Sequence, residues 1–313
     1  MNTKVDLSII IVNWNTRDLL AQCLQSLQDT VQESSFKVWV VDNDSSDGSV
    51  AMIQEQFPQT HVIANPENVG FVHANNQAIP RCQGRYVLLL NSDTLALPGS
   101  LDKTVKFMDN HPDSGMLGVR LVNADGTFQA SFTPFPNLWR EFLVLSGLGR
   151  WLIRPSYPSY GPQVEGGAQK IEGYVEGAFM LARRQALDQI GGLDERIFMY
   201  AEDVDWCYRF DQAGWEIWYL PHTPIIHYGG QSTKKRPGRM EAELYRSRVY
   251  FFHKHYGKVA ASSLKAMIYA STLLKIVLHK MLRLVSRGRK GRIVTGWKEL
   301  RTTLNQAPGR KAT

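Results

Sequence analysis

The first 95 residues alternate between two hydrophobic patterns, and this alternation restricts the fold more than any other feature of the sequence. Three short apolar runs, residues 7–12 (LSIIIV), 38–41 (VWVV) and 86–90 (YVLLL), each end abruptly in a polar residue. Residues 19–27 carry apolar side chains at a helical period, and a second helical stretch lies near 50–57. Fully apolar strands separated by helices predict βαβ units and a buried, mostly parallel sheet, which is an α/β fold.

The residues that end the three runs are Asn13, Asp42 and Asn91. Ligands of open α/β sheets bind at the carboxyl ends of the strands, so these positions are candidate binding residues. At Asp42 we favour ligand contact, because a carboxylate there can accept from a ribose hydroxyl or a base N–H. For residues 44–47 we favour capping of the next helix. A dinucleotide dehydrogenase would need G-x-G-x-x-G after the first strand, where residues 13–16 read NWNT, so redox chemistry is disfavoured.

Three further groups could carry chemistry. Asp93 of Asn91-Ser-Asp93 follows a buried strand, and a carboxylate at that place suits a divalent cation that bridges phosphates. The same tripeptide is also a common turn. Glu202 and Asp203 open a cluster of three acids within residues 202–205, which suits either a general base or an exposed helix start, although bulky neighbours indicate partial burial. His227 ends the last apolar run, where a ligand role and a structural role are both open.

The chain after residue 115 is less regular. We interpret residues 132–167, which hold five of the 14 prolines, as a long excursion over the sheet that serves as a lid or acceptor wall. The pattern predicts strands at 116–122, 174–182, 215–220 and 225–227, a turn at 123–126, and helices at 184–190, from about 202, and beyond 241.

Charge divides the chain into two parts. Residues 1–233 carry 16 basic and 26 acidic side chains, whereas residues 234–313 carry 20 basic and 3 acidic ones. In residues 264–285 most apolar side chains gather on one helical face and most basic ones on the other, which predicts an amphipathic helix. Residues 286–313 are predicted to be disordered. The basic arm suits an anionic membrane surface, while packing of its apolar face on protein is the alternative; no nucleic-acid-binding motif accompanies it.

The compartment is predicted to be reducing, because Cys23, Cys82 and Cys207 lie far apart and form no C-x-x-C pair. The N-terminus has no secretory pattern, and no run reaches the ~18 uninterrupted apolar residues of a membrane-spanning helix. We therefore expect a cytoplasmic protein that contacts a membrane only from its surface.

Six segments, in order along residues 5–232, resemble family 2 glycosyltransferases, which have the GT-A fold, and most of all their bacterial rhamnosyltransferase-type branch. These segments are VDNDSSDGS at 41–49, Asn68-x-Gly70-Phe71 with Asn75-Asn76, LLLNSD at 88–93, VEGAFMLARR at 175–184, GGLDERIFMYAEDVDWCYR at 191–209, and the segment that begins at His227. The resemblance implies a GT-A domain over 1–235, and the apolar and charge pattern adds an amphipathic helical region over 236–285 and a basic tail over 286–313.

The resemblance also implies roles for individual residues. Asp203 would be the base that deprotonates the acceptor hydroxyl, and Asp93 and His227 would hold Mg²⁺ or Mn²⁺ on the donor diphosphate. The residues implied in donor binding are Asn13, Asn15, Asp42, Asn68, Gly70, Asn76, Asn91 and Glu202. Asn91 stands where the D-x-D motif has its first acid, so the metal site has one carboxylate fewer than the motif provides.

The implied reaction is a single inverting displacement, with dTDP-L-rhamnose as donor and a lipid-linked saccharide or cell-surface glycan as acceptor, at the cytoplasmic face of the membrane. A UDP-sugar donor is an alternative. A membrane-attached module that binds nucleotide or glycan without catalysis is the rival from another class, and the presence of Asp93, Glu202 and Asp203 argues against it.

Overall fold

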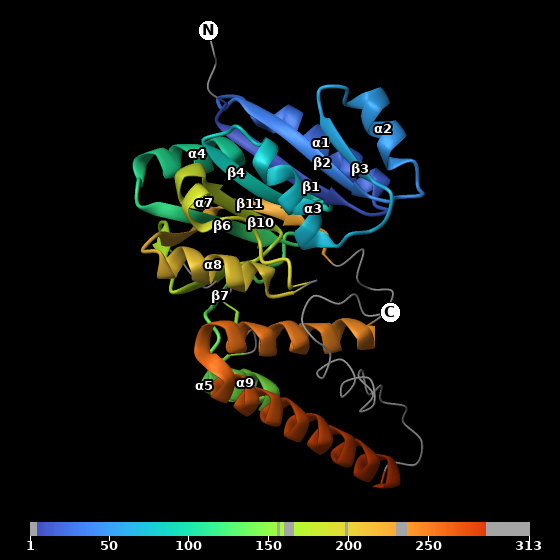
Figure 1. Cartoon of the computed structure of the whole chain (residues 1–313), viewed down its shortest axis with the longest axis vertical. Helices are drawn as coiled ribbons and strands as arrows, with labels where there is room; N and C mark the ends of the chain where they lie inside the picture. Colours follow the sequence, from blue (N-terminus) through green and yellow to red (C-terminus); the bar gives the residue numbers. More distant parts are fainter. Residues whose placement is uncertain (1–4, 155–156, 160–165, 198–199, 230–236, 286–313) are drawn as a thin grey trace. The chain divides into compact units, whose positions relative to one another are not determined.

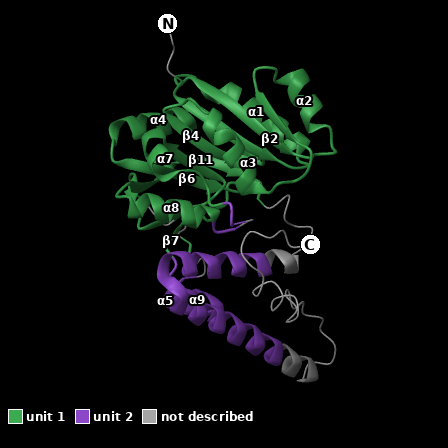
Figure 2. Cartoon of the chain, in the orientation of Figure 1, with its two compact units in different colours: residues 1–135, 159–194, 202–232 green, residues 136–158, 195–201, 233–313 purple. Residues whose placement is uncertain are grey.

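The computed structural model describes residues 5–154, 157–159, 166–197, 200–229 and 237–285 (Figure 1). The chain forms two compact units (Figure 2), one of residues 1–135, 159–194 and 202–232, the other of residues 136–158, 195–201 and 233–313. The second unit thus takes 136–158 and 195–201 in addition to the C-terminal region that the sequence set apart. The tail 286–313, predicted to be disordered, lies outside the described residues.

The helices and strands follow in chain order. The first unit contains β1 (Leu7–Asn13), α1 (Arg17–Thr30), β2 (Phe36–Asn43), α2 (Ser49–Gln56), β3 (His61–Asn65), α3 (Phe71–Ala78), the 3-10 helix η1 (Ile79–Arg81), β4 (Tyr86–Asn91), β5 (Thr94–Leu95), α4 (Ser100–Asn110), β6 (Ser114–Val122), β7 (Phe132–Pro134), β8 (Gln169–Lys170), β9 (Gly173–Val175), β10 (Phe179–Arg183), α7 (Arg184–Ile190), α8 (Glu202–Gln212) and β11 (Glu216–His227). The second unit contains α5 (Leu138–Ser146), α6 (Leu148–Leu152) and α9 (Pro237–Val285).

The main sheet has the strand order β3-β2-β1-β4-β10-β6-β11-β5, with β8 paired to β11. β1 pairs in parallel with β2 and β4, and β2 with β3, which confirms the parallel sheet predicted from the first 95 residues. β10 runs antiparallel between β4 and β6, and β6 is parallel to β11. The antiparallel β10 therefore separates two parallel groups within one sheet.

The core of the first unit lies on both faces of this sheet. Ile9 and Ile11 join a buried cluster with side chains of α1, α2 and α4, whereas Ile10, which alternation directs to the opposite face, lies outside that cluster. α3 packs on β1 and β2, and α8 on β9 and β11 (Figure 1). Because both faces are covered, the strands are apolar throughout, as the sequence indicated.

Two predicted strand assignments differ from the structure. The apolar run at 174–182 forms two strands, because a turn in which the N–H of Phe179 donates to the carbonyl oxygen of Glu176 separates β9 from β10. β9 then pairs with β7 in a small second sheet. The runs at 215–220 and 225–227 instead form the single strand β11, whose pairing shifts register between Leu220 and Pro224.

The second unit is built around α9, which breaks at Gly257, where φ is 85°. α5 packs on α9, the hydroxyl of Tyr256 donates to the carbonyl oxygen of Pro136 at 2.9 Å, and Arg248 pairs with Glu141. Of the predicted amphipathic helix, Leu264 is fully buried in this unit, whereas the side chains of residues 273–278 are largely exposed. Its first turns thus pack on protein, and its later turns leave an apolar surface uncovered.

One helix among the described residues is long and apolar enough to cross a membrane, judged by length and composition. This stretch is Ala242–Leu278 within α9, with a mean hydropathy of 1.3 over its most apolar 18 residues and 22% of that window buried. The sequence reading, which required an uninterrupted apolar run, did not identify it because Lys265 and Lys275 interrupt the pattern.

Candidate active site

The carboxyl ends of β1, β2 and β4 bring together the polar residues that end these strands. Asn13 lies opposite Asp42 in the register of β1 and β2, and Val12 lies opposite Asn91 in that of β1 and β4. Beyond the strand ends, the hydroxyls of Thr16 and Ser92 lie 2.9 Å apart. The prediction that Asn13, Asp42 and Asn91 share one edge of the sheet is confirmed.

Asp42 is 2% exposed and organises the loops after β1 and β2. Its Oδ2 accepts from the side-chain amide of Asn13 at 2.7 Å, and its Oδ1 accepts from the N–H of Ser45 at 2.9 Å. The hydroxyl of Thr16 donates to Oδ1 of Asn13 at 2.6 Å, which fixes the orientation of that amide. An ionised carboxylate has about four acceptor positions, so Asp42 keeps capacity beyond these two bonds.

The neighbouring loop residues hold the two loops to each other. Oδ1 of Asn15 accepts from the N–H of Ser46 at 2.8 Å, and φ at Asn15 is 53°, in the left-handed region that asparagine tolerates. Asp47 accepts from the N–H and hydroxyl of Ser49 in the first turn of α2, which is a structural role, although Gly48 and not residues 44–47 is the N-cap of that helix. Asn15 is thus positioned beside Asp42 by hydrogen bonds that use its own side chain.

The segment before α3 approaches the end of β2. The N–H of Gly70 donates to Oδ1 of Asn68 at 2.9 Å, and φ at Gly70 is 88°. The carbonyl oxygen of Gly70 accepts from the amide of Asn43, which follows Asp42, at 3.3 Å. The structure therefore places Asn68 and Gly70 next to the strand end that holds Asp42.

Asn76 makes a contact of a different kind. Its amide nitrogen donates to the carbonyl oxygen of Leu193, and its amide oxygen accepts from the N–H of Leu193, both at 2.9 Å. This pair of bonds joins α3 to the loop after α7. These two bonds give the side chain of Asn76 a structural role, and its part in donor binding stays a prediction.

Asp93 and His227 meet at the end of β11. The pairing of β5 with β11 sets Thr94 opposite His227, and Oδ1 of Asp93 lies 3.2 Å from Nε2 of the His227 ring. The amide nitrogen of Asn91 lies 3.4 Å from the same Nε2. Asp93 is 8% exposed. The two residues predicted to hold a metal, 134 positions apart in the chain, are therefore adjacent.

Gln129, which the sequence reading did not identify, holds the other side of the His227 ring. Its amide nitrogen donates to the carbonyl oxygen of His227 and to Oδ1 of Asn123, both at 2.6 Å, so its Oε1 is the atom that faces Nδ1 of His227 at 2.8 Å. An amide oxygen only accepts, so Nδ1 carries the proton and donates. In a neutral ring, Nε2 then presents its lone pair toward Asp93 and Asn91.

The side chains of Asp93 and His227 fit a divalent cation that a diphosphate also binds. Within the described ranges, no three His, Cys, Asp or Glu side chains form a group that could hold a metal alone. A carboxylate from Asp93 and an imidazole nitrogen from His227 make two ligands of the types that Mn²⁺ and Mg²⁺ accept. Such ions are commonly bound by one or two protein groups, with substrate phosphates and water completing the shell.

α8 places Asp203 at the same edge of the sheet. The N–H of Asn91 donates to the carbonyl oxygen of Ala178 at 3.1 Å, which sets the 176–178 turn against the end of β4. A Cβ added to Gly177 in that turn would lie 3.7 Å from Oδ2 of Asp203. Gly177 therefore marks the close approach of Asp203 to the turn beside Asn91, and a larger side chain would come between them.

The rest of α8 is held firmly. Arg209 donates to the carboxylate of Asp205 at 2.9 Å and to the carbonyl oxygens of Ile190 and Gly192. Asp205, the third acid of the cluster, is 0% exposed and has this structural partner. The two residues before α8, Tyr200 and Ala201, have φ of 64° and 74°, a strained conformation for residues with side chains. Glu202 and Asp203 thus stand in the first turn of a helix that Arg209 anchors, directly after two residues with strained backbone conformations.

Glu202 and Asp203 differ in their environments. Oε2 of Glu202 is fully enclosed and has no hydrogen-bond partner, although the residue as a whole is partly exposed. Burial of this carboxyl and the negative charge of Asp203 raise the pKa of Glu202 to about 8. Asp203 accepts from the N–H of Val204 in the first turn of α8, where the helix dipole favours a negative charge. At neutral pH the proton of the pair therefore resides on Glu202.

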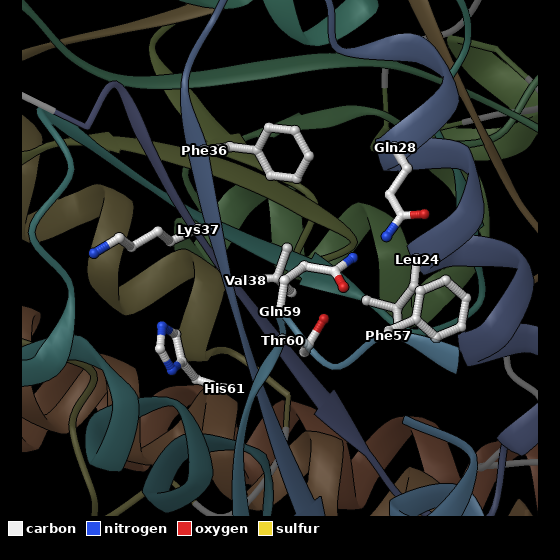
Figure 3. A pocket seen from close by; sticks show the side chains of 9 residues that line it. All are labelled: Leu24, Gln28, Phe36, Lys37, Val38, Phe57, Gln59, Thr60 and His61. Carbon is white, nitrogen blue, oxygen red and sulfur yellow. The ribbon is translucent and has the colours of Figure 1, made fainter. Parts of the chain in front are cut away.

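A hollow of about 300 Å³ lies elsewhere in the first unit (Figure 3). It is lined by side chains from α1, the start of β2 and the segment that enters β3: Leu24, Gln28, Phe36, Lys37, Val38, Phe57, Gln59, Thr60 and His61. Phe36 begins β2, whereas Asp42 stands near its other end, so this hollow is at the opposite edge of the sheet from the acids. It is not part of the candidate active site.

The strand order of the main sheet, with helices on both of its faces, defines a GT-A fold. Two solved structures share this fold: a mannosyltransferase from Pyrobaculum calidifontis in complex with GDP-Man and Mn²⁺, and GalNAc-T7 with UDP, GalNAc and Mn²⁺. The first matches with a TM-score of 0.54 at 15% identity over 97% of this chain and 84% of that one. The second matches with a TM-score of 0.56 at 12% identity over 82% and 51%.

The chain belongs to glycosyl transferase family 2, whose sequence model matches residues 8–191, and a second model, glycosyltransferase-like family 2, matches residues 167–246. An N-acetylglucosaminyl-diphospho-decaprenol L-rhamnosyltransferase of Mycobacterium tuberculosis is 27% identical over 93% of this chain and 98% of its own. Rhamnosyltransferase WbbL of Escherichia coli K12 is 26% identical over 70% and 82%. The protein is a glycosyltransferase of the rhamnosyltransferase-like type, as the sequence resemblance implied.

Proposed function

We propose that this glycosyltransferase transfers L-rhamnose from dTDP-L-rhamnose to a lipid-linked saccharide, with inversion and with the help of a divalent cation. The observation that carries the proposal is the 3.2 Å contact between Asp93 and His227, beside the strand ends that hold Asn13 and Asp42. The sugar is chosen because two relatives along most of the chain are rhamnosyltransferases. The acceptor class is chosen because one of them is described as acting on a diphospho-decaprenol-linked sugar.

The nucleotide would bind at the ends of β1 and β2. The free acceptor capacity of Asp42 suits a ribose hydroxyl or a base N–H, and Asn13 and Asn15 stand beside it. Asn68 and Gly70 lie next to this end of β2, where the backbone at Gly70 lets a ligand approach without a side chain in the way. These residues would orient the donor so that its diphosphate extends toward Asn91 and Asp93.

The diphosphate would lie where Asp93 and His227 meet. A divalent cation held there by the Asp93 carboxylate and Nε2 of His227 would neutralise the charge that develops on the leaving nucleoside diphosphate. Asn91, which has replaced the first acid of D-x-D, can donate its amide N–H to a phosphate oxygen instead of adding a carboxylate to the metal shell. The protein therefore supplies one negative charge to this site, and the donor supplies the others.

Asp203 would act as the general base. In a single displacement, an acceptor oxygen forms a bond to the anomeric carbon while the bond from that carbon to the diphosphate oxygen breaks. The acceptor's proton passes to Asp203, and the bond electrons leave with the nucleoside diphosphate. A base so placed contributes about 10²–10⁴ in rate. Asp203 suits the task because Glu202 keeps the proton of the pair, which leaves the Asp203 carboxylate ready to accept another.

The protein would work at the cytoplasmic face of a membrane, which it would contact peripherally through the later turns of α9. Leu273, Leu274, Val277 and Leu278 are 43–58% exposed there, and from Leu244 to Leu278 the helix contains no acid. Lys265 and Lys275 favour a surface orientation over a span. Alkaline carbonate should release the protein from membranes, whereas a spanning helix would keep it in the pellet.

Nucleotide release tests the reaction. The purified full chain is incubated with Mn²⁺ and a panel of dTDP-, UDP- and GDP-sugars, with and without a lipid-linked N-acetylglucosamine acceptor. We expect acceptor-dependent release of dTDP from dTDP-L-rhamnose, and its loss by at least about 100-fold in Asp203→Asn. Preference for a UDP-sugar would replace the proposed donor. Tight donor binding with no turnover across the acceptor panel would indicate a binding module instead of an enzyme.

A further inference from the structure

The segment between β7 and β8 carries large aromatic side chains that are exposed and take no part in the core of the first unit. Trp139 is 65% exposed and Trp151 is 80% exposed, the two most exposed of the described tryptophans. Leu152 and Ile153 beside Trp151 are 60% and 54% exposed. We call the exposed side chains of α5, α6 and Ile153 the α5–α6 surface. It lies wholly within the second unit (Figure 2).

This exposure belongs to a folded segment with an inner side of its own. Asn137 caps α5 by accepting from the N–H of Arg140 at 2.9 Å, and Leu143 and Leu145 of the same helix are buried. Gly147, with φ of 77°, turns the chain into α6, where Gly149 packs so closely on Tyr157 that a Cβ would clash. Leu143 and Leu145 form the packed side of this segment, so Trp139 and Trp151 are exposed although the segment has a core of its own.

The α5–α6 surface presents cationic and apolar groups without exposed acids. Glu141 is the one acid of residues 136–158; it is 4% exposed and paired with Arg248. Arg150 is exposed next to Trp151, and Arg140 and Arg154 are partly exposed. Tryptophan with one apolar and one polar end, flanked by arginine, is typical of the boundary between lipid headgroups and acyl chains.

Among possible occupants, the charges favour an anionic lipid surface. Headgroups of anionic lipids attract arginine, while the apolar rings enter the outer acyl region. Protein interfaces are also rich in Trp and Arg, so the choice of lipid rests on the positive charge of this surface and on a second exposed apolar and basic surface in the same unit. The later turns of α9, in the same unit, show the same combination of exposed leucine and lysine without acids.

We infer that the α5–α6 surface inserts into the interfacial region of an anionic phospholipid bilayer, as a contact separate from the arm beyond residue 272. The inference concerns membrane attachment and does not depend on which sugar is transferred. It also replaces the lid or acceptor wall that the sequence suggested for residues 132–167 with a different role for their central part.

A site-specific fluorophore tests this contact in the full chain. Trp151→Cys can be labelled selectively with an environment-sensitive dye, because Cys23, Cys82 and Cys207 are all buried. On vesicles of phosphatidylglycerol and phosphatidylcholine we expect a blue shift, and quenching by lipids brominated near the headgroup. The matched control is Lys103→Cys, at an exposed position of α4, which should keep the emission of a dye in water. A water-like signal from position 151 on vesicle-bound protein would overturn the inference.

Co-sedimentation supplies an independent measurement. Trp139→Ser combined with Trp151→Ser should weaken binding to the anionic vesicles by about 10-fold or more, and Arg150→Glu should weaken it several-fold. Lys103→Glu, the same charge change in the first unit, should not. Thermal unfolding must match that of the parent chain. If these variants bind as the parent does, the α5–α6 surface is not a membrane contact. If the dye responds to protein concentration without lipid, the surface is an interface between copies of the chain instead.

Discussion

Nδ1 of His227 donates to Oε1 of Gln129 over 2.8 Å, and the amide nitrogen of Gln129 donates back to the backbone carbonyl of His227. One side chain thus holds both the ring and the backbone of the histidine. The arrangement leaves Nε2 as the atom that can bind a cation, which is how second ligand layers commonly orient histidine in metal sites. Gln129 is therefore a positioning residue for the proposed metal site.

Gln129→Met should weaken binding of Mn²⁺ in the presence of a nucleoside diphosphate by about 10–100-fold, because the ring loses its fixed orientation and tautomer. The affinity can be measured by the electron paramagnetic resonance of free Mn²⁺. The nitrogen-15 shifts of the His227 ring should change from the Nδ1–H tautomer to a mixture. Thr127→Ala, in the same exposed turn, is the control. An unchanged ring spectrum would remove Gln129 from this role.

Asn91→Asp restores the first acid of the D-x-D motif. An added carboxylate beside Asp93 raises the charge of the ligand set, so we expect Mn²⁺ to bind about 10-fold more tightly. Without metal, the carboxylates repel each other and the Asn91 contact to His227 at 3.4 Å is lost, so the melting temperature should fall. Both quantities can be followed by thermal unfolding with and without Mn²⁺. If metal did not stabilise this variant more than the parent, the site would lie elsewhere.

The raised pKa of Glu202 predicts a pH dependence of stability. The folded protein keeps the Glu202 proton up to about pH 8, whereas the unfolded chain releases it near the ordinary value of 4.5. Between these values the folded state binds more protons, so stability falls as pH rises, by at most about 1.4 kcal/mol per pH unit. Glu202→Gln should remove this slope. Urea unfolding of both proteins at pH 5, 6.5 and 8 measures it, and parallel curves would contradict the assignment.

A substitution at Asn76 can distinguish a structural role of this residue from a role in donor binding. Asn76→Ala leaves the N–H and carbonyl of Leu193 without partners, which should cost about 1–3 kcal/mol of stability. Affinity for the nucleoside diphosphate, measured by calorimetry below the melting transition, should change less than twofold. Gly192→Ala, whose Cβ would clash with Oδ1 of Asn76, should reproduce the stability loss. A large drop in donor affinity with normal stability would support the donor-binding role predicted for Asn76.

The sequence predicted the strand-end residues well because parallel pairing leaves little freedom. Once residues 7–12, 38–41 and 86–90 are strands of one parallel sheet, their polar terminators must lie at one edge. The pattern marked Asp203 and His227 as candidates, but their roles came from family resemblance, since no local pattern distinguishes a base from a helix cap, or a ligand histidine from a structural one. The positioning role of Gln129 could not be predicted, because it depends on contact with His227 of β11, which lies 98 residues further along the chain.

Pairing partners also explain the errors in the strand assignments. Residues 174–182 are apolar enough for one strand, yet Glu176 donates its N–H to the carbonyl oxygen of Ser131, and the turn that follows separates β9 from β10. Glu176 and Gly177 within this turn gave one visible signal, a polar residue and a glycine inside an otherwise apolar run. That interruption could have identified the turn that approaches Asp203.

The structure also indicates where the arm can be shortened. Leu264 and Ile268 are buried and Thr272 is 9% exposed, whereas Leu273, Leu274, Val277 and Leu278 are exposed. Truncation after Thr272 removes the exposed turns and the basic tail while keeping the packed part of α9. We expect unchanged thermal stability and binding to anionic vesicles weakened by at least about 10-fold, because each basic residue near such a surface contributes about 1 kcal/mol.

The salt dependence of vesicle binding separates the contribution of the basic arm beyond residue 272 from that of the α5–α6 surface. The full chain should lose affinity for anionic vesicles steeply between low and high ionic strength, because the Debye length falls from ~30 Å at 0.01 M to ~3 Å at 1 M. The truncated chain retains the α5–α6 surface and fewer exposed cations, so its weaker binding should depend less on salt. Vesicle co-sedimentation of both chains at three salt concentrations measures this difference. If the truncated chain binds as tightly as the full chain at low salt, the arm beyond residue 272 does not attach this glycosyltransferase to membranes.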